Sequence, residues 1–163
     1  MPPGPPKPLL RAALSVFRRL PGPLRRRAVH AGTPNYTVGA VALVRTGAGH
    51  VLLLQQRHRE GWSLPGGLLR TGESPERALA RELAEELHLS VDAAELTGSL
   101  PVAVVDAQTR RVDLVYVLQR EEVGAVDDIE VLEARWFPPD ALPECSQGTD
   151  VILHGCQVAP PVR

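Results

Sequence analysis

The chain has few cysteines and no apolar run long enough to cross a bilayer. Its 163 residues include only two cysteines, Cys145 and Cys156. Two thiols in a chain of this length do not form the framework of a disulfide-stabilised protein, so we expect both to be free and reduced. No stretch approaches the roughly 18 apolar residues of a transmembrane helix. We therefore expect no membrane span and a cytoplasmic location.

Acidic residues are absent from the N-terminal part of the chain. Residues 1–36 hold seven basic side chains and no acid, whereas the remainder holds 11 basic and 19 acidic residues. The first eight residues are rich in proline and cannot build a packed core. Short helices are predicted at 9–20 and 24–31, separated by Pro21-Gly22-Pro23. We predict that residues 1–35 form a basic arm with short helices and that residues 36–163 form the main domain.

The role of this arm is open at the level of sequence. Arginine-rich, acid-free N-termini occur in organelle targeting peptides, but this one is rich in proline and poor in serine, and it lacks the apolar region of a secretory signal. A basic arm can also contact an acidic or phosphate-bearing surface, including a nucleic acid. It can equally fold on its own domain or remain a solvated extension.

Motifs for covalent or zinc-dependent catalysis are also missing. Ser63, Ser74 and the two cysteines have no evident base partner. His154 and Cys156 form an isolated H-x-C pair without the further ligands that a zinc site requires. Any hydrolytic chemistry therefore has to come from another group of residues.

The pattern from residue 36 onward predicts a mixed α/β domain. Strands are predicted at 38–44 and 51–56 as a hairpin, and again at 111–119 and 130–137. Residues 91–105 read as a loop and a strand. A helix is predicted from Pro75 to about Leu87, with Ser74 as its N-cap, and a second near 150–157. Helices packed on a sheet are the expected architecture.

The helix predicted at 75–87 carries an unusual group of carboxylates. Glu82 and Glu86 are four residues apart and share one face, and Glu85 borders that face. Like charges at this spacing cost about 0.2–0.5 kcal/mol per pair, so a cation should compensate them. Mg²⁺ binds carboxylate oxygens and leaves positions for phosphate oxygens. The core stripe of the same helix is Leu79, Leu83 and Leu87.

Residues 67–89 resemble the Nudix box, G-x5-E-x7-R-E-U-x-E-E-x-G-U, in which U is a bulky aliphatic residue. The matching positions are Gly67, Glu73, Arg81, Glu82, Leu83, Glu85, Glu86 and Leu89. His88 stands where the family has glycine. Because that glycine ends the helix with a positive φ, we expect His88 to cost some stability without removing metal binding.

The resemblance implies an α/β/α sandwich with a mixed sheet and the hydrolysis of a nucleoside diphosphate linked to another group. It implies a requirement for Mg²⁺ or Mn²⁺ and, as in many relatives, a homodimer. By analogy with the family, metal ligands would come from Glu82, Glu85, Glu86 and the Gly66 carbonyl. Catalysis would use Glu82, Glu85 and Arg81, while Gly67 and Glu73 would be structural.

Substrate contacts are less clearly encoded. Arg57 and Arg59 precede the glycine-rich segment and are candidates for binding phosphate, and Trp62 is a candidate for contact with the substrate. A further acidic ligand or base could come from Asp127, Asp128 or Glu130. Asp106 stands where diadenosine-polyphosphate hydrolases of the family tend to carry tyrosine, and Val104 and Val105 where members that act on ADP-ribose tend to carry proline.

Two alternatives to a small-molecule hydrolase remain at this point. A Nudix-like module could sense a nucleotide without turnover, although such a module would be free to lose Glu82, Glu85 and Glu86. An RNA 5′-end pyrophosphohydrolase could use the basic arm to contact the RNA backbone.

Overall fold

The computed structural model describes residues 7–98, 100–124, 126 and 129–158. The chain divides into two compact units with a boundary between Asn35 and Tyr36. The N-terminal unit contains α1 (Lys7–Arg19) and α2 (Gly22–Gly32), close to the two predicted helices. Leu14 and Val16 are more than half exposed on α1. Over the residues that the structure covers, no helix has the length and apolar character needed to span a bilayer.

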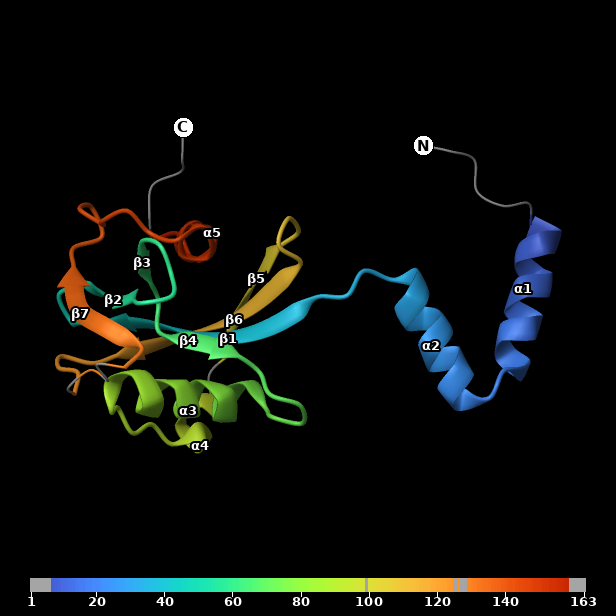
Figure 1. Cartoon of the computed structure of the whole chain (residues 1–163), viewed down its shortest axis with the longest axis horizontal. Coiled ribbons are helices and arrows are strands. Elements are labelled where there is room, and N and C mark those ends of the chain that lie inside the picture. The colour runs from blue at the N-terminus through green and yellow to red at the C-terminus, as the bar shows by residue number, and fades with distance from the viewer. Residues whose placement is uncertain (1–6, 99, 125, 127–128, 159–163) are drawn as a thin grey trace. The chain divides into compact units, whose positions relative to one another are not determined.

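The C-terminal unit is built on a seven-stranded mixed sheet (Figure 1). Its strands are β1 (Thr37–Arg45), β2 (Val51–Gln56), β3 (Trp62–Ser63), β4 (Gly66–Leu68), β5 (Val102–Asp106), β6 (Arg111–Gln119) and β7 (Val131–Phe137). The central order is β3-β2-β1-β6-β5, with β4 paired to β1 and β7 to β2. β1 and β6 run parallel over nine residue pairs, while the other pairings are antiparallel.

Helices cover both faces of this sheet. Figure 1 shows α3 (Pro75–Leu87) and α4 (Ala93–Thr97) on one face and α5 (Gln147–Gly155) on the other. Successive residues of β1 face opposite sides, as strand geometry requires. Ala40 and Ala42 join a core with α3, whereas Val41 and Leu43 join a second core with α5. The predicted α/β/α sandwich with a mixed sheet is confirmed.

Capping fixes both ends of α3. Ser74 accepts a hydrogen bond from the backbone N–H of Arg77, and Pro75 occupies the first turn. At the other end His88 adopts the left-handed conformation, with φ 49° and ψ 26°, and its N–H bonds the Leu83 carbonyl. His88 therefore replaces the family's glycine without changing how the helix ends. A non-glycine residue in this region is strained by about 1–2 kcal/mol.

Three details differ from the sequence-based expectation. Residues 51–56 do form a strand, but only Arg45 and Val51 are paired between β1 and β2, because β4 occupies the neighbouring edge of β1. The glycine-rich segment expected to be a turn thus contributes a short strand of its own. Residues 93–97 form the short helix α4, whose Asp92 cap accepts a hydrogen bond from Ala94, where a loop was expected.

Candidate active site

The glycine pair at 66–67 brings the β4 backbone close to both β1 and α3. Gly66 has φ 131°, a conformation that side chains rarely adopt, and a Cβ there would overlap the Ala40 carbonyl. A Cβ on Gly67 would overlap the Glu82 carboxylate. Glycine at both positions therefore lets the Glu82 carboxylate of α3 lie directly against the strand.

Arg81 holds three of the acidic side chains in place. Its Nε and Nη2 donate to the two oxygens of Glu73 at 3.0 and 3.1 Å. Its Nη1 donates to Glu82 at 2.7 Å and to Glu85 at 3.2 Å. Glu73 also accepts the Arg70 backbone N–H at 2.9 Å, so it ties the loop before α3 to the helix. These charge-assisted bonds lower the pKa of Glu73 to about 2, with the Arg81 hydrogen bond as the largest cause.

Glu86 lies in a different environment from the other two glutamates. It is 3% exposed, and it accepts hydrogen bonds from the Gly66 backbone N–H at 3.0 Å and from the Gln56 amide. The pKa of Glu86 is raised to about 7, chiefly by burial and also by the nearby charges of Glu82 and Glu130, although the Gly66 N–H and Arg59 act to lower it. This carboxylate is therefore poorly solvated and surrounded by negative charge, conditions that favour a neutralising cation.

Glu82, Glu85 and Glu86 of α3 line a single cleft of about 320 Å³. Their donor chemistry fits Mg²⁺ or Mn²⁺, because hard carboxylate oxygens from one helix adjoin the backbone of Gly66 and Gly67. Within the described ranges, no three His, Cys, Asp or Glu side chains are grouped closely enough to hold a metal as they stand. The reason is local, since Arg81 pairs with Glu82 and Glu85 while Gln56 and Gly66 bond Glu86.

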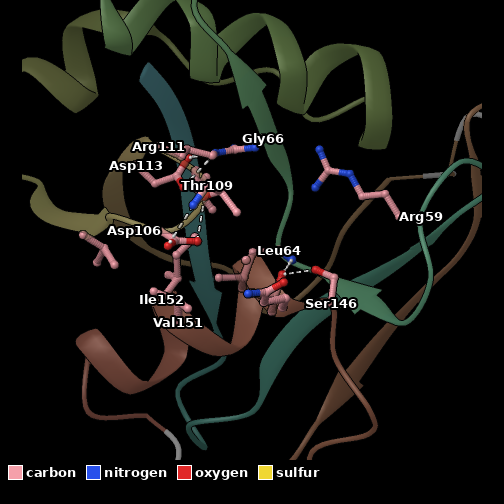
Figure 2. A pocket seen from close by; sticks show the side chains of 15 residues that line it. Arg59, Leu64, Gly66, Asp106, Thr109, Arg111, Asp113, Ser146, Val151 and Ile152 are labelled. Carbon is pink, nitrogen blue, oxygen red and sulfur yellow. Dashed lines mark hydrogen bonds and ion pairs between the residues drawn. The ribbon is translucent and has the colours of Figure 1, made fainter. Parts of the chain in front are cut away.

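A second cavity of about 270 Å³ lies on the α5 side of the sheet (Figure 2). Its walls come from β1, β5, β6 and the start of α5. The apolar walls include Val41, Leu64 and Ile152. Its polar groups are contributed by Asp106, Thr109, Arg111, Asp113, Ser146 and Thr149. No aromatic side chain is among the described residues that line it.

The cleft and the second cavity share two lining residues, Arg59 and Gly66. Figure 2 shows the Arg59 side chain on one side of Gly66 and Arg111 on the other. The two cavities therefore adjoin at Arg59 and Gly66.

Of the three residues predicted to contact the substrate, one lines the cavities and two do not. Arg59 lines both cavities, but Arg57 and Trp62 are not among the lining residues of either. Trp62 packs edge-on against Phe137 at 4.8 Å between ring centroids, with the Arg135 guanidinium 5.6 Å from its own ring. Its aromatic surface is therefore used in packing beside the α5 core.

Among the acids before β7, Glu130 lines the cleft with the α3 glutamates. Asp127 and Asp128 lie outside the described residues.

Sequence reasoning missed the residues that support Glu86 and those that form the second cavity. Gln56 is 3% exposed, and its side-chain oxygen accepts a hydrogen bond from Ser63 while its amide donates to Glu86. A polar residue at a core-facing position of an apolar strand was the only available signal. Arg111 and Asp113 were also detectable in principle, because they share one face of a strand. Nothing in the sequence places that face beside Gly66.

Comparisons with known proteins agree with this geometry. The model of the NUDIX domain matches residues 35–154. A MutT-like protein of Streptomyces ambofaciens is 31% identical over 113 residues, which cover 68% of this chain and 70% of the relative. The 8-oxo-dGDP phosphatase NUDT18 of Homo sapiens is 29% identical over 153 residues, 88% of this chain but 43% of that protein.

Solved structures show the same fold. The MutT Nudix hydrolase of Burkholderia pseudomallei superimposes with a TM-score of 0.59 at 26% identity, covering 75% of this chain and 98% of that one. An ADP-ribose pyrophosphatase of Streptococcus suis gives a TM-score of 0.61 at 22% identity, covering 75% and 90%. The box at residues 67–89, the sandwich fold and the matched domain lead to one assignment: this chain belongs to the Nudix hydrolase family.

Proposed function

We propose that this protein hydrolyses the pyrophosphate bond of a nucleoside diphosphate linked to another group. The observation that carries the proposal is the alignment of Glu82, Glu85 and Glu86 along one cleft, which shares the lining residues Arg59 and Gly66 with a second cavity. In such a site the carboxylates of the cleft would act on the phosphate chain. The second cavity, with its polar and apolar walls, would bind the group attached to that chain.

Glu82, Glu85 and Glu86 would hold Mg²⁺ or Mn²⁺, with the Gly66 carbonyl as a further ligand. When bound, such an ion neutralises charge on phosphate oxygens and lowers the pKa of a coordinated water. The side chain of Arg81 fixes Glu82 and Glu85 before any ion arrives, at 2.7 and 3.2 Å. Glu86 is fixed separately by the Gly66 N–H.

Glu82 is the residue we assign to orienting the attacking water. Its carboxylate lies against the Gly67 backbone and is held from the other side by Arg81. A carboxylate held in one position can orient a water that donates a hydrogen bond to it, and this orientation lowers the entropic part of the barrier. Glu85 is more exposed, with a side chain 52% accessible, and can assist from the open side of the cleft.

Basic side chains at the rim would hold the phosphate chain. Arg59 and Arg70 line the cleft opposite the glutamates. Arg70 also lies 3.6 Å from Glu85, so a phosphate entering the cleft would compete for this exposed ion pair. A guanidinium offers several donors to phosphate oxygens in a fixed plane.

The proposal is tested with a panel of nucleoside triphosphates, nucleotide sugars and dinucleoside polyphosphates incubated with the full chain and Mg²⁺. Products are separated chromatographically, so that release of pyrophosphate, phosphate or a nucleoside monophosphate identifies the bond that is cleaved. We expect turnover that EDTA abolishes and that E82Q and E86Q strongly reduce. E95Q is the matched control, because Glu95 is an exposed glutamate of α4 that lies outside the cleft lining and pairs with Arg120.

A nucleotide-sensing module would give a different result in the same assay. It would bind members of the panel without turnover in Mg²⁺ or Mn²⁺, and E82Q would bind as the unchanged chain does. That outcome would replace the catalytic proposal.

Hydrolysis at the 5′ end of RNA is a second candidate, favoured by the exposed arginines of α2. Arg25, Arg26 and Arg27 are all exposed, and no acidic residue accompanies them in this unit. The test compares 5′-triphosphorylated RNA with the free nucleotide, using the full chain and a chain that lacks residues 1–35. A preference for RNA that falls with rising salt and with loss of the arm would support it. Equal rates on RNA with and without the arm would exclude this role for the arm.

A further inference from the structure

We propose that Arg111, positioned by Asp113, is a specificity-determining residue that recognises a base with a carbonyl oxygen at purine C6 or pyrimidine C4, as in guanine and uracil, over one with an amino group at that position, as in adenine and cytosine. The proposal rests on the function proposed above, since it concerns the group that the diphosphate carries into the second cavity.

Arg111 and Asp113 form a closely bonded pair on one face of β6. The Arg111 Nε lies 2.8 Å from each oxygen of Asp113, and its Nη2 lies 2.7 Å from Oδ1. Asp113 is only 5% exposed. A buried carboxylate that uses both oxygens on one guanidinium fixes the plane of that guanidinium and leaves it little freedom to turn.

The neighbouring strand β1 leaves room for this ion pair. Gly39 of β1 is in register with Asp113 of β6. A Cβ at Gly39 would overlap the Asp113 carboxylate and would come within 2.8 Å of the Arg111 Nη2. The space for the ion pair therefore depends on a residue without a side chain. Because a positive φ is not required at Gly39, the absence of a Cβ is the property that matters there.

One nitrogen of Arg111 is left for a ligand. Nε and Nη2 are used by Asp113, while Nη1 has no hydrogen-bond partner among the described residues of the chain. The Arg111 side chain is 25% exposed and lines the second cavity. In Figure 2 it extends from the pair with Asp113 toward Gly66, where the cavity adjoins the acidic cleft. A group attached to a diphosphate in that cleft would pass this nitrogen.

The chemistry of the free nitrogen determines what it can recognise. A guanidinium only donates hydrogen bonds, so a nitrogen aimed at purine C6 or pyrimidine C4 pairs with a carbonyl oxygen there and opposes an amino group. The charge of Arg111 is already balanced by Asp113, so the site suits an uncharged acceptor. Val41, Leu64, Val104 and Ile152 surround it with aliphatic surface. In such surroundings an unmatched donor costs about 1–3 kcal/mol, which corresponds to roughly a tenfold or greater preference.

The test measures binding and therefore does not depend on turnover. Dissociation constants for the α,β-methylene diphosphates of guanosine, uridine, adenosine and cytidine are measured calorimetrically with the full chain and Mg²⁺. We expect the guanosine and uridine analogues to bind about tenfold more tightly than the adenosine and cytidine analogues. In R111K this preference should fall to within about threefold, because lysine pairs with Asp113 as a point charge and has no further nitrogen for the ligand.

Three further variants separate recognition from folding. R111M/D113L removes both charges together, which avoids leaving Asp113 buried alone, and it should lose the preference as R111K does. G39A displaces the pair and should reduce the preference although Arg111 is still present. R110Q removes one arginine immediately before Arg111, at a position outside the cavity lining, and should keep the preference.

Equal affinities of the four analogues for the unchanged chain, or an unchanged preference in R111K and R111M/D113L, would overturn the proposal. Either result would leave the proposed function standing if metal-dependent hydrolysis is observed. Conversely, the unchanged chain could show no hydrolysis and still bind the four analogues with the expected preference. That result would refute the proposed function and support the role of Arg111 in recognition.

Discussion

The two cavities on either side of Gly66 are built in opposite ways. The acidic cleft takes most of its residues from positions 66–86, a glycine-rich strand and the helix that follows it. The second cavity draws on β1, β5, β6 and α5, segments separated by up to about a hundred residues. Local sequence therefore encodes the part that would act on the phosphate chain, whereas topology assembles the part that would select the attached group. Variants on the two sides should accordingly have different signatures.

The largest effect is expected from the glutamates of α3. E82Q and E86Q should each lower kcat by at least about 100-fold for every substrate, because loss of a metal ligand removes several kcal/mol of charge stabilisation. Steady-state kinetics in Mg²⁺ measure the loss, and circular dichroism checks that the fold remains. A loss of kcat confined to some substrates would contradict the division of roles between the cleft and the second cavity. E95Q, the control, should leave all rates unchanged.

The contact of Gly67 with Glu82 should be almost as sensitive. In G67A the new methyl group overlaps the Glu82 carboxylate and must displace it. Misplacement of a reacting group by about 1 Å can cost on the order of 100-fold, so we expect kcat/KM to fall by about 10- to 100-fold. G98A is the matched control, since a Cβ there has open space. An unchanged kcat/KM in G67A would show that displacement of the Glu82 carboxylate does not affect catalysis.

Filling the second cavity should affect binding of the substrate and leave the metal site alone. Val151 lines this cavity from α5, and V151F adds a ring to it. We expect KM to rise by about tenfold or more for substrates with a large attached group, at an overpacking cost to stability of about 1–3 kcal/mol. Titration with Mn²⁺ should give the same affinity as in the unchanged chain. A similar rise in KM for inorganic pyrophosphate would contradict the separation.

The end of α3 allows a smaller, purely structural test. Because His88 has φ 49°, replacement by glycine relieves strain in the left-handed region. We expect H88G to raise the free energy of unfolding by about 0.5–1 kcal/mol, measured by urea denaturation, without change in kcat. A decrease in stability would mean that the contacts of the histidine outweigh its backbone strain.

The smallest effect concerns the pH dependence of stability through Glu73. Its pKa is held near 2 in the folded protein, below the ordinary 4.5, chiefly by the hydrogen bond from Arg81. Because the folded pKa is depressed, this contribution is present above about pH 4.5 and is lost as the pH falls toward 2. The stability difference between the unchanged chain and E73Q should therefore shrink between pH 6 and pH 3 in thermal denaturation. A constant difference would exclude this role of the Glu73 carboxylate.

Much of the fold was predictable because its signals are local. Runs of apolar residues located β1, β2 and β6, and the sequence Ser74-Pro75 located the start of α3 within a residue. The β3 and β4 strands were missed, because Gly66 and Gly67 read as a turn when their partner β1 is unknown. The short helix α4 was missed as well, since five residues carry too little periodicity to distinguish a helix from a loop.

The candidate site likewise has features that the local sequence reveals and features that depend on tertiary contacts. Glu82, Glu85 and Glu86 were identifiable from their spacing, and the matching box marked Arg81 and Glu73, but their ion pair appears only in the structure. Neither the burial of Glu86 under Gln56 nor the exclusion of Trp62 from the cavity linings was visible. These features depend on which strands are neighbours, and a single strand does not reveal its neighbours.

By itself, the sequence determined that one helix carries Glu82, Glu85 and Glu86 at close spacing, that a glycine pair precedes it and that a basic segment stands before the domain. A helix fixes the spacing of its own side chains, so this information survives without tertiary contacts. The tertiary structure alone decided that Arg111 and Asp113 lie beside Gly66. Their position follows from the parallel pairing of β1 with β6, which joins segments about seventy residues apart.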